Sequence, residues 1–204
     1  IQVPHQFSEP RDVEIAAFLT ATIAWGNRKM IIRNAKRLIN IIDNAPYDFI
    51  INHKDKHLQK MEGFVHRTFN FTDLITFIDA LKHIYLKQDG LEGIFNKHKT
   101  SESLQPAIHQ LREEFFSIPH LVRTKKHLPD PLNGSAAKKI NMYLRWMIRN
   151  DKCGVDFGLW KEISPSILSC PLDVHSGRIA RRFGLLKRKQ DDAKSVKELD
   201  NSLR

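Results

Sequence analysis

Apolar side chains recur at three- and four-residue intervals along most of the chain, which is the pattern of amphipathic helices. Polar and acidic residues around Pro10 are typical of a helix start, and the apolar segment that follows runs from Ile15 to Ile23. Asn27 can cap a second helix, which must stop before Pro46. Because strand-like alternation is scarce, the pattern predicts an all-α fold.

The middle and the end of the chain continue this periodicity. Thr72 or Asp73 is expected to open one helix, and residues 101–116 are expected to form another. A further helix is predicted from about Ala136 to Arg149. Loops are expected at Pro119, at residues 128–131 and at Gly154, where turn-forming residues occur.

The length of 204 residues suits one domain built as two lobes. The middle helices, about 45–117, are expected to form a bundle, and residues 1–44 are expected to join 118–204 in the other lobe. No apolar run approaches the ~20 residues of a membrane-spanning helix. The chain begins without Met and ends inside an amphipathic pattern, so we expect terminal segments to be missing.

Positive charge is concentrated in one part of the chain. The whole chain has 33 basic and 23 acidic residues, a net charge of +10. Residues 121–189 contain 15 of the basic and five of the acidic residues, and therefore the entire surplus. Such a block suits a polyanion, most simply the phosphates of nucleic acid, whereas the alternative is a solvated face that maintains solubility.

Cysteine and histidine usage predicts neither a metal site nor a cofactor. Cys153 and Cys170 are too few for a disulfide framework or an iron–sulfur cluster, and a reducing, cytoplasmic location is the default. His53 and His57 have the spacing of one helix face, but the charged residues around them indicate a solvated loop rather than a zinc site.

Two linked features carry candidate chemistry. The first is the turn at 129–135, which opens a helix whose N–H groups, near Gly134 and Ser135, can bind a phosphate. A helical wheel places Lys138 opposite the apolar face and Lys139 about 100° away from Lys138. Both are ordinary solvated lysines unless further context gives them a role.

The second feature is the segment from Cys170 to Arg178, in which Pro171 favours an extended approach to a helix. Asp173 stands at the N-cap position of that helix. It either caps the helix only, or it is also a rigidly held carboxylate that stabilises a developing cation.

Together these features resemble the helix-hairpin-helix (HhH-GPD) superfamily of base-excision DNA glycosylases. In that family a Gly/Pro-rich loop precedes an essential Asp, similar to Pro171-Leu172-Asp173-Val174-His175. Lys138-Lys139-Ile140-Asn141 is similar to its Lys-Thr-Ala-Asn-type element, which puts Lys138 at the nucleophile position. The interval of 35 residues from this lysine to Asp173 resembles the archaeal 8-oxoguanine glycosylase branch. The chain also resembles a bacterial family of hypothetical proteins in this superfamily, through the segments 24–28 and 141–147.

The hairpin departs from the family pattern. It reads Leu132-Asn133-Gly134-Ser135 where relatives have Leu-Pro-Gly-x-Gly, so its anchoring of duplex DNA is expected to be altered. The iron–sulfur loop of many relatives is absent. The resemblance leaves a monovalent cation, bound by backbone carbonyls of the hairpin, as the one cofactor candidate.

The resemblance implies a bifunctional glycosylase and AP lyase that removes an oxidised purine, such as 8-oxoguanine, from double-stranded DNA. Lys138 would attack the sugar C1′ and form a Schiff base, while Asp173 would stabilise the oxocarbenium-like sugar. The other class is a non-catalytic helix-hairpin-helix protein that binds nucleic acid, which would have no need for this pair.

Further residues are candidates for contact with DNA. Trp25 either stacks on a base or lies in the core, and Asn27 either reads a base edge or caps a helix. The basic candidates either bind phosphates or form a solvated face. The complete set of DNA-contact candidates is Trp25, Asn27, Arg28, Gly134, Ser135, Lys139, His175, Arg178 and Arg182.

Overall fold

The computed structural model describes residues 1–151 and 153–204, and it confirms the predicted all-α class. The α-helices are α1 (Pro10–Thr22), α2 (Arg28–Ile41), α3 (Pro46–Asn52), α4 (Asp55–Leu58), α5 (Phe71–Lys87), α6 (Gly90–His98), α7 (Gln105–Phe115), α8 (Lys138–Ile148), α9 (Val174–Arg182) and α10 (Ala193–Leu203). The 3-10 helices are η1 (Pro4–Gln6), η2 (Gln59–Met61), η3 (Val122–His127) and η4 (Pro165–Ile167). Strands β1 (Val65–His66) and β2 (Phe69–Asn70) form a small antiparallel hairpin with Val65 opposite Asn70.

The chain divides into two compact units. The N-terminal unit comprises Ile1–Ile94 and Glu113–Leu128, and the C-terminal unit comprises Phe95–Arg112 and Pro129–Arg204. This division differs from the expected one, in which residues 45–117 formed a lobe of their own. The reason is that α1 packs against α3, and α3 packs against α5, so the first helices share a core with the middle ones.

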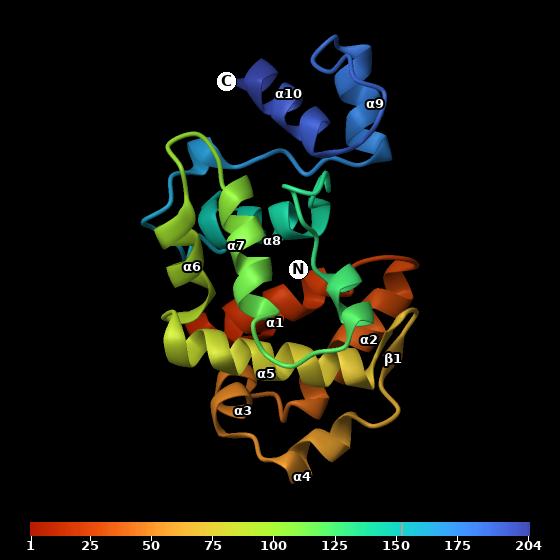
Figure 1. The fold of residues 1–204 in the computed structure, drawn as a ribbon, viewed down its shortest axis with the longest axis vertical. Helices are drawn as coiled ribbons and strands as arrows, with labels where there is room; N and C mark the ends of the chain where they lie inside the picture. Colours follow the sequence, from red (N-terminus) through yellow and green to blue (C-terminus); the bar gives the residue numbers. More distant parts are fainter. Residues whose placement is uncertain (152) are drawn as a thin grey trace. The chain divides into compact units, whose positions relative to one another are not determined.

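Aromatic rings fill the core of the N-terminal unit. Phe77 of α5 lies 4.5 Å from Phe115, 5.2 Å from Phe69 and 6.2 Å from Phe18 of α1, measured between ring centroids. All four rings are fully buried. Burial of each ring contributes about 1.5–3 kcal/mol of stability, and α1 and α5, which carry Phe18 and Phe77, lie side by side in this core (Figure 1).

Two helix starts lie at different residues from those expected, for local reasons. The N-cap of α5 is Asn70, whose side chain accepts the N–H of Asp73 at 3.2 Å, while the Asp73 carboxylate accepts the N–H of Asn70 at 3.0 Å. This capping box begins the helix before Thr72. Helix α7 begins four residues after 101, because Thr100 and Ser103 bond to each other in a turn.

Asp73 also joins α5 to η3, and its removal should be costly. Its side chain is fully buried, one oxygen accepts from Arg123 at 2.7 Å and the other accepts from the Thr124 hydroxyl at 2.8 Å. Asp73→Ala leaves the buried Thr124 hydroxyl without its acceptor and breaks the ion pair. We expect a loss of about 3 kcal/mol in the free energy of unfolding, measured by urea denaturation. A loss below about 1 kcal/mol, typical of a surface pair, would contradict this role.

The C-terminal unit has its own core. Trp160 lies 5.3 Å from Phe95 and 5.5 Å from Tyr143 of α8, between ring centroids. Helices α9 and α10 lie side by side (Figure 1) and close a smaller cluster of buried apolar residues. That cluster consists of Leu172, Ala180, Leu186, Val196 and Leu199. No helix in the described part of the chain is both long and apolar enough to cross a membrane.

Candidate active site

The turn before α8 is built by Asp130, a residue that the sequence analysis did not single out. One carboxylate oxygen accepts the N–H of Leu132 at 3.1 Å and faces His109 Nδ1 at 3.0 Å, and the other accepts from the Asn133 side chain at 2.7 Å. Burial opposes ionisation, but the bonds from His109 and Asn133 prevail and lower the pKa of Asp130. The Pro-Asp-Pro sequence was the available signal, because Asp after Pro is typical of a turn that its own side chain closes.

Backbone hydrogen bonds complete the hairpin. Gly134, at a φ of 92°, donates to the Pro131 carbonyl at 3.1 Å, and Ser135 donates to the Asp130 carbonyl at 3.0 Å. The Gly134 carbonyl accepts the N–H of Ala193 at 3.0 Å. Gly is required at position 134 because other residues adopt this φ at a steric cost. These carbonyls hold the hairpin together, and the cation expected from the resemblance stays a prediction.

Helix α8 starts abruptly at Lys138. The preceding Ala137 is its N-cap and has a φ of 46°, a left-handed conformation that costs a non-glycine residue roughly 1–2 kcal/mol. Asn141 stabilises this start, since its side-chain amide donates to the Ala136 carbonyl at 3.0 Å. The predicted apolar face of α8 is buried, and Lys138 is exposed as the helical wheel indicated.

Asp173 caps α9, as predicted. Its Oδ1 accepts the N–H groups of His175 and Ser176, both at 2.9 Å. The Ser176 hydroxyl accepts the N–H of Asp173 at 2.8 Å, which completes a capping box. These three hydrogen bonds fix the carboxylate and the backbone of Asp173 at the start of the helix.

The second oxygen of Asp173 has a different partner. Its Oδ2 lies 2.6 Å from Nζ of Lys138, so the structure brings together the two residues that the sequence analysis proposed as catalytic. The bond from Lys138 and the N–H groups of α9 hold the pKa of Asp173 well below its usual range. Oδ1 of Asp173 thus caps α9, while Oδ2 contacts the amine of Lys138 at the start of α8.

Lys139 lies next to the pair and has a different environment. It is half-buried, and burial lowers its pKa to about 8. In the unfolded chain the pKa is about 10.4, so between these values the unfolded state binds more protons than the folded state. Lys139 therefore makes the free energy of unfolding increase as the pH rises through this window.

Lys139→Met should reveal this gain. As the pH rises from about 7.5 to about 10, the unfolding free energy of the wild type should increase relative to that of the variant, because the wild type alone has the shifted lysine. Urea titrations of both proteins at several pH values measure this difference. A difference that stays constant over the window contradicts a desolvated lysine.

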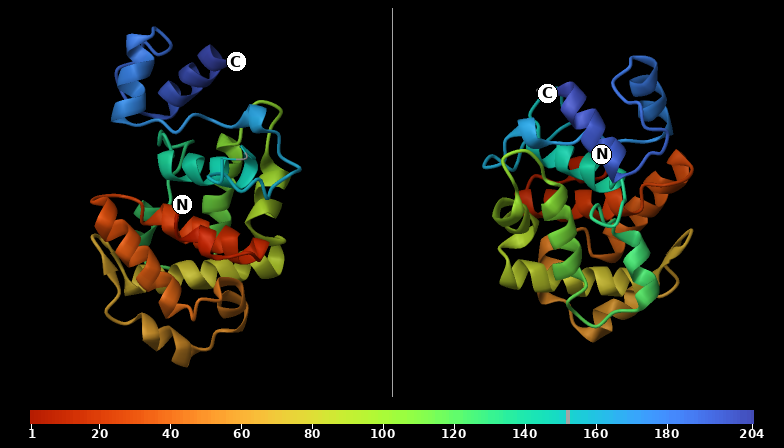
Figure 2. Two further views of the ribbon diagram at one scale, coloured as in Figure 1. Left: turned by 180° about the vertical axis from the view of Figure 1, so that it is seen from behind. Right: turned by 45° about the horizontal axis from the view of Figure 1, so that its top comes forward.

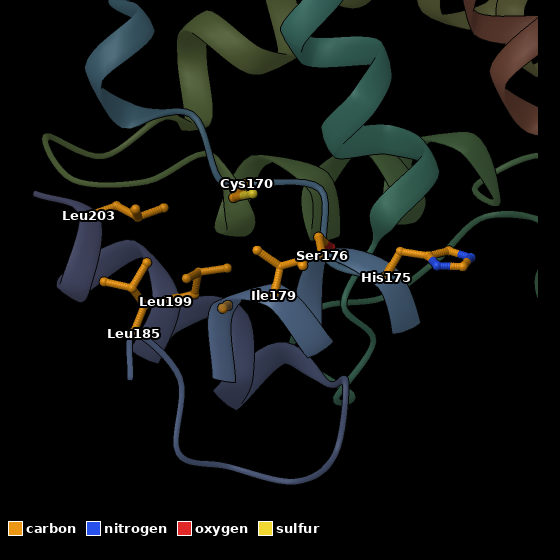
Figure 3. A pocket seen from close by; sticks show the side chains of 8 residues that line it. Cys170, His175, Ser176, Ile179, Leu185, Leu199 and Leu203 are labelled. Carbon is orange, nitrogen blue, oxygen red and sulfur yellow. The ribbon is translucent and has the colours of Figure 1, made fainter. Parts of the chain in front are cut away.

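A hollow of about 370 Å³ lies beside the start of α9. Ile179, Leu185 and Leu199 point into it in Figure 3, whereas the His175 ring points away from this apolar lining. Cys170 lies at the edge, and burial raises the pKa of its thiol. The start of α9 thus has a charged side, where Asp173 meets Lys138, and an apolar side.

The comparison with known families covers the whole chain. The family model described as "Protein of unknown function (DUF2400)" matches residues 1–204. The chain belongs to the DUF2400 family. No curated protein and no solved structure matches it.

The basic side chains near the C-terminus of this DUF2400 member differ in whether an acidic residue pairs with them. Arg181 and Arg188 bind Asp191 and Asp192, so their charges are partly neutralised within the fold. Arg178 and Arg182 are exposed at one-turn spacing on α9, and neither forms an ion pair with another described residue. These two are the better phosphate candidates of the basic segment.

Three predicted DNA contacts of the DUF2400 chain lie in the N-terminal unit. Trp25 is half-buried, with its ring 5.0 Å from that of His66 and stacked 6.0 Å from that of His127. Asn27 accepts the N–H of Lys29 at 2.9 Å, which confirms its capping role. Arg28 is exposed. Base contact by these residues stays a prediction.

The histidines considered for zinc have other partners. His53 Nδ1 lies 2.9 Å from the Ile50 carbonyl and its Nε2 lies 3.2 Å from Asp79, while His57 accepts the N–H of Lys54 at 3.1 Å. Across residues 1–151 and 153–204, no group of three or more His, Cys, Asp or Glu side chains is placed to hold a metal ion.

Proposed function

We propose that the protein is a DNA repair glycosylase with AP-lyase activity, which removes an oxidised purine such as 8-oxoguanine from duplex DNA. The observation that carries this proposal is the 2.6 Å contact between Lys138 and Asp173. An amine and a rigidly held carboxylate at adjoining helix starts are the two groups that the reaction needs. The hairpin before α8 and the capped α9 support an HhH-GPD-like arrangement for the C-terminal unit.

In the proposed reaction, Nζ of Lys138 attacks C1′ of the damaged nucleotide as the glycosidic bond breaks and the base leaves with the bonding electrons. The amine must first lose the proton that it shares with Asp173. The attached nitrogen loses a second proton, and the C1′–O4′ bond of the sugar ring then opens, with O4′ taking up a proton, to give the Schiff base. Removal of a C2′ proton allows β-elimination, which breaks the bond between C3′ and the 3′ phosphate oxygen. The damaged base has to leave the stack for Nζ to reach C1′.

The role of Asp173 in this scheme is electrostatic. Because its pKa lies well below the usual range, it stays ionised and is a weak proton acceptor. An ionised carboxylate, fixed by the N–H groups of α9, stabilises positive charge on the sugar as the base departs. The departing base and solvent then take part in the proton transfers.

Product analysis tests the proposal. The full chain is incubated with a duplex that contains one 8-oxoguanine and, separately, with the same duplex containing guanine. We expect released 8-oxoguanine and a strand cut 3′ to the lesion in the first duplex only. Binding of both duplexes without base release would favour the non-catalytic nucleic-acid-binding protein instead.

A further inference from the structure

Helix α2 presents a row of positive charge that lies outside the basic segment of the sequence. Its 14 residues include five basic and no acidic side chains. Lys29, Arg33, Lys36 and Arg37 are exposed and fall within roughly 100° of one another around the helix axis. We call these four residues the α2 basic row. Figure 2 shows α2 along the edge of the N-terminal unit, beside the β1–β2 hairpin.

The α2 basic row lacks intramolecular counter-charges. Within the described part of the chain, none of its four side chains forms an ion pair with a carboxylate. Asp43, which follows the helix, forms an ion pair with Lys60 instead, with Nζ of Lys60 2.9 Å from its Oδ1. Arg37 alone has a structural contact, because it donates to the Gly63 carbonyl at 3.1 Å and lies over the Phe64 ring. Four uncompensated positive charges on one face repel one another, and an anionic partner would reduce this repulsion.

We infer that the α2 basic row is a second surface for the phosphates of duplex DNA. The row spans about 12 Å along the helix. One DNA strand carries a phosphate about every 3.4 Å, so roughly three to four phosphate charges face a row of this length. The inference rests on the nucleic-acid partner of the proposed function and does not depend on its lysine chemistry.

The composition of α2 favours DNA over two other anionic partners. A helix that binds a membrane surface inserts an apolar face, but Ala35, Leu38 and Ile39 of α2 are packed inside the unit and almost inaccessible. The core of a protein interface needs exposed apolar side chains, and no large hydrophobic residue of α2 is exposed. A purely charged row suits a phosphate backbone.

The test uses a variant with Lys29→Gln, Arg33→Gln and Lys36→Gln, which leaves the structural Arg37 intact. The matched control replaces three exposed lysines elsewhere by Gln, namely Lys56, Lys87 and Lys97. Both variants lose the same charge, and circular dichroism establishes that both are folded. Affinity for a fluorescent, undamaged duplex is measured between ~50 and ~200 mM salt.

Each phosphate contact adds ~0.9 to the slope of log affinity against log salt concentration. We expect the slope of the α2 variant to fall by about 2.7, and that of the control to match the wild type. An unchanged slope in the α2 variant overturns the inference. A second result would also overturn it: the wild type binds phosphatidylserine vesicles but not the duplex, and the α2 variant no longer binds the vesicles.

The outcome is separable from that of the proposed function, because the duplex carries no lesion. A chain that binds DNA through the α2 basic row but releases no 8-oxoguanine keeps this inference and loses the proposed activity. If the wild type releases 8-oxoguanine but the salt slope of the α2 variant is unchanged, the proposed activity stands and this inference fails.

Discussion

Lys138→Gln is expected to abolish Schiff-base formation and strand cleavage on a duplex containing 8-oxoguanine. An amide nitrogen is not a nucleophile, so no covalent intermediate can form at this position. Lys138 is exposed, and a Gln can still donate to Asp173, so the unfolding free energy should change by less than about 0.5 kcal/mol. Duplex affinity should change little, because one cation is lost. Borohydride trapping, gel analysis of cleavage and thermal unfolding measure these effects.

Lys139→Gln is the matched control, because it removes the neighbouring amine of the same helix turn. Lys139 has a pKa of about 8 and is therefore more easily deprotonated than an ordinary lysine, but it is Lys138 whose Nζ lies 2.6 Å from the Asp173 carboxylate. We expect Lys139→Gln to retain trapping. Loss of trapping in Lys139→Gln with full trapping in Lys138→Gln would show that the nucleophile is Lys139.

Asp173→Asn should lower the rate of base release by about 10²–10³-fold, the usual effect of removing one preorganised electrostatic group from a site. The oxygen of Asn can still cap α9, because Asn and Asp cap helices about equally well. The variant loses the ion pair with Lys138, which is partly exposed and worth at most about 1 kcal/mol. Single-turnover rates of base release and urea denaturation separate the two effects.

Asp192→Asn provides a control of the same chemistry. Asp192 caps α10 by accepting the N–H of Ser195 at 3.0 Å, and it pairs with Arg188 as Asp173 pairs with Lys138. Its replacement should alter stability by a similar amount and leave base release unchanged. Equal rates in wild type and Asp173→Asn would reduce Asp173 to a helix cap.

Local sequence patterns predict the helices that have a long apolar stripe or a strong cap. Asn27 and Asp173 are predictable N-caps, because their side chains accept N–H groups from residues directly after them. The start of α5 was harder to predict, since Asn70, Thr72 and Asp73 are all good caps and the reciprocal bond of a capping box decides among them. Helices α3, α4 and α6 have at most nine residues, too few to show a clear period.

The candidate site was predicted in its residues but not in its geometry. The sequence places Lys138 and Asp173 at two helix starts, yet nothing local says that side chains 35 residues apart lie 2.6 Å from each other. The resemblance to glycosylases indicated the two residues, but not the distance between them. Charge counting likewise identified the basic segment, but pairs such as Arg181 with Asp191 depend on the fold. The α2 basic row could not be found by counting charges, because the basic and acidic residues outside 121–189 are equal in number.

Lysine catalysis is tested most directly by trapping the wild-type protein with borohydride on a duplex that contains 8-oxoguanine, and by locating the adduct with fragment-ion mass spectrometry. We expect one covalent complex, absent with the guanine duplex, in which the reduced sugar is attached to Nζ of Lys138. An adduct on another lysine would contradict the assignment of the nucleophile. The absence of any adduct, under conditions in which the protein binds the duplex, would contradict lyase chemistry at the Lys138–Asp173 pair.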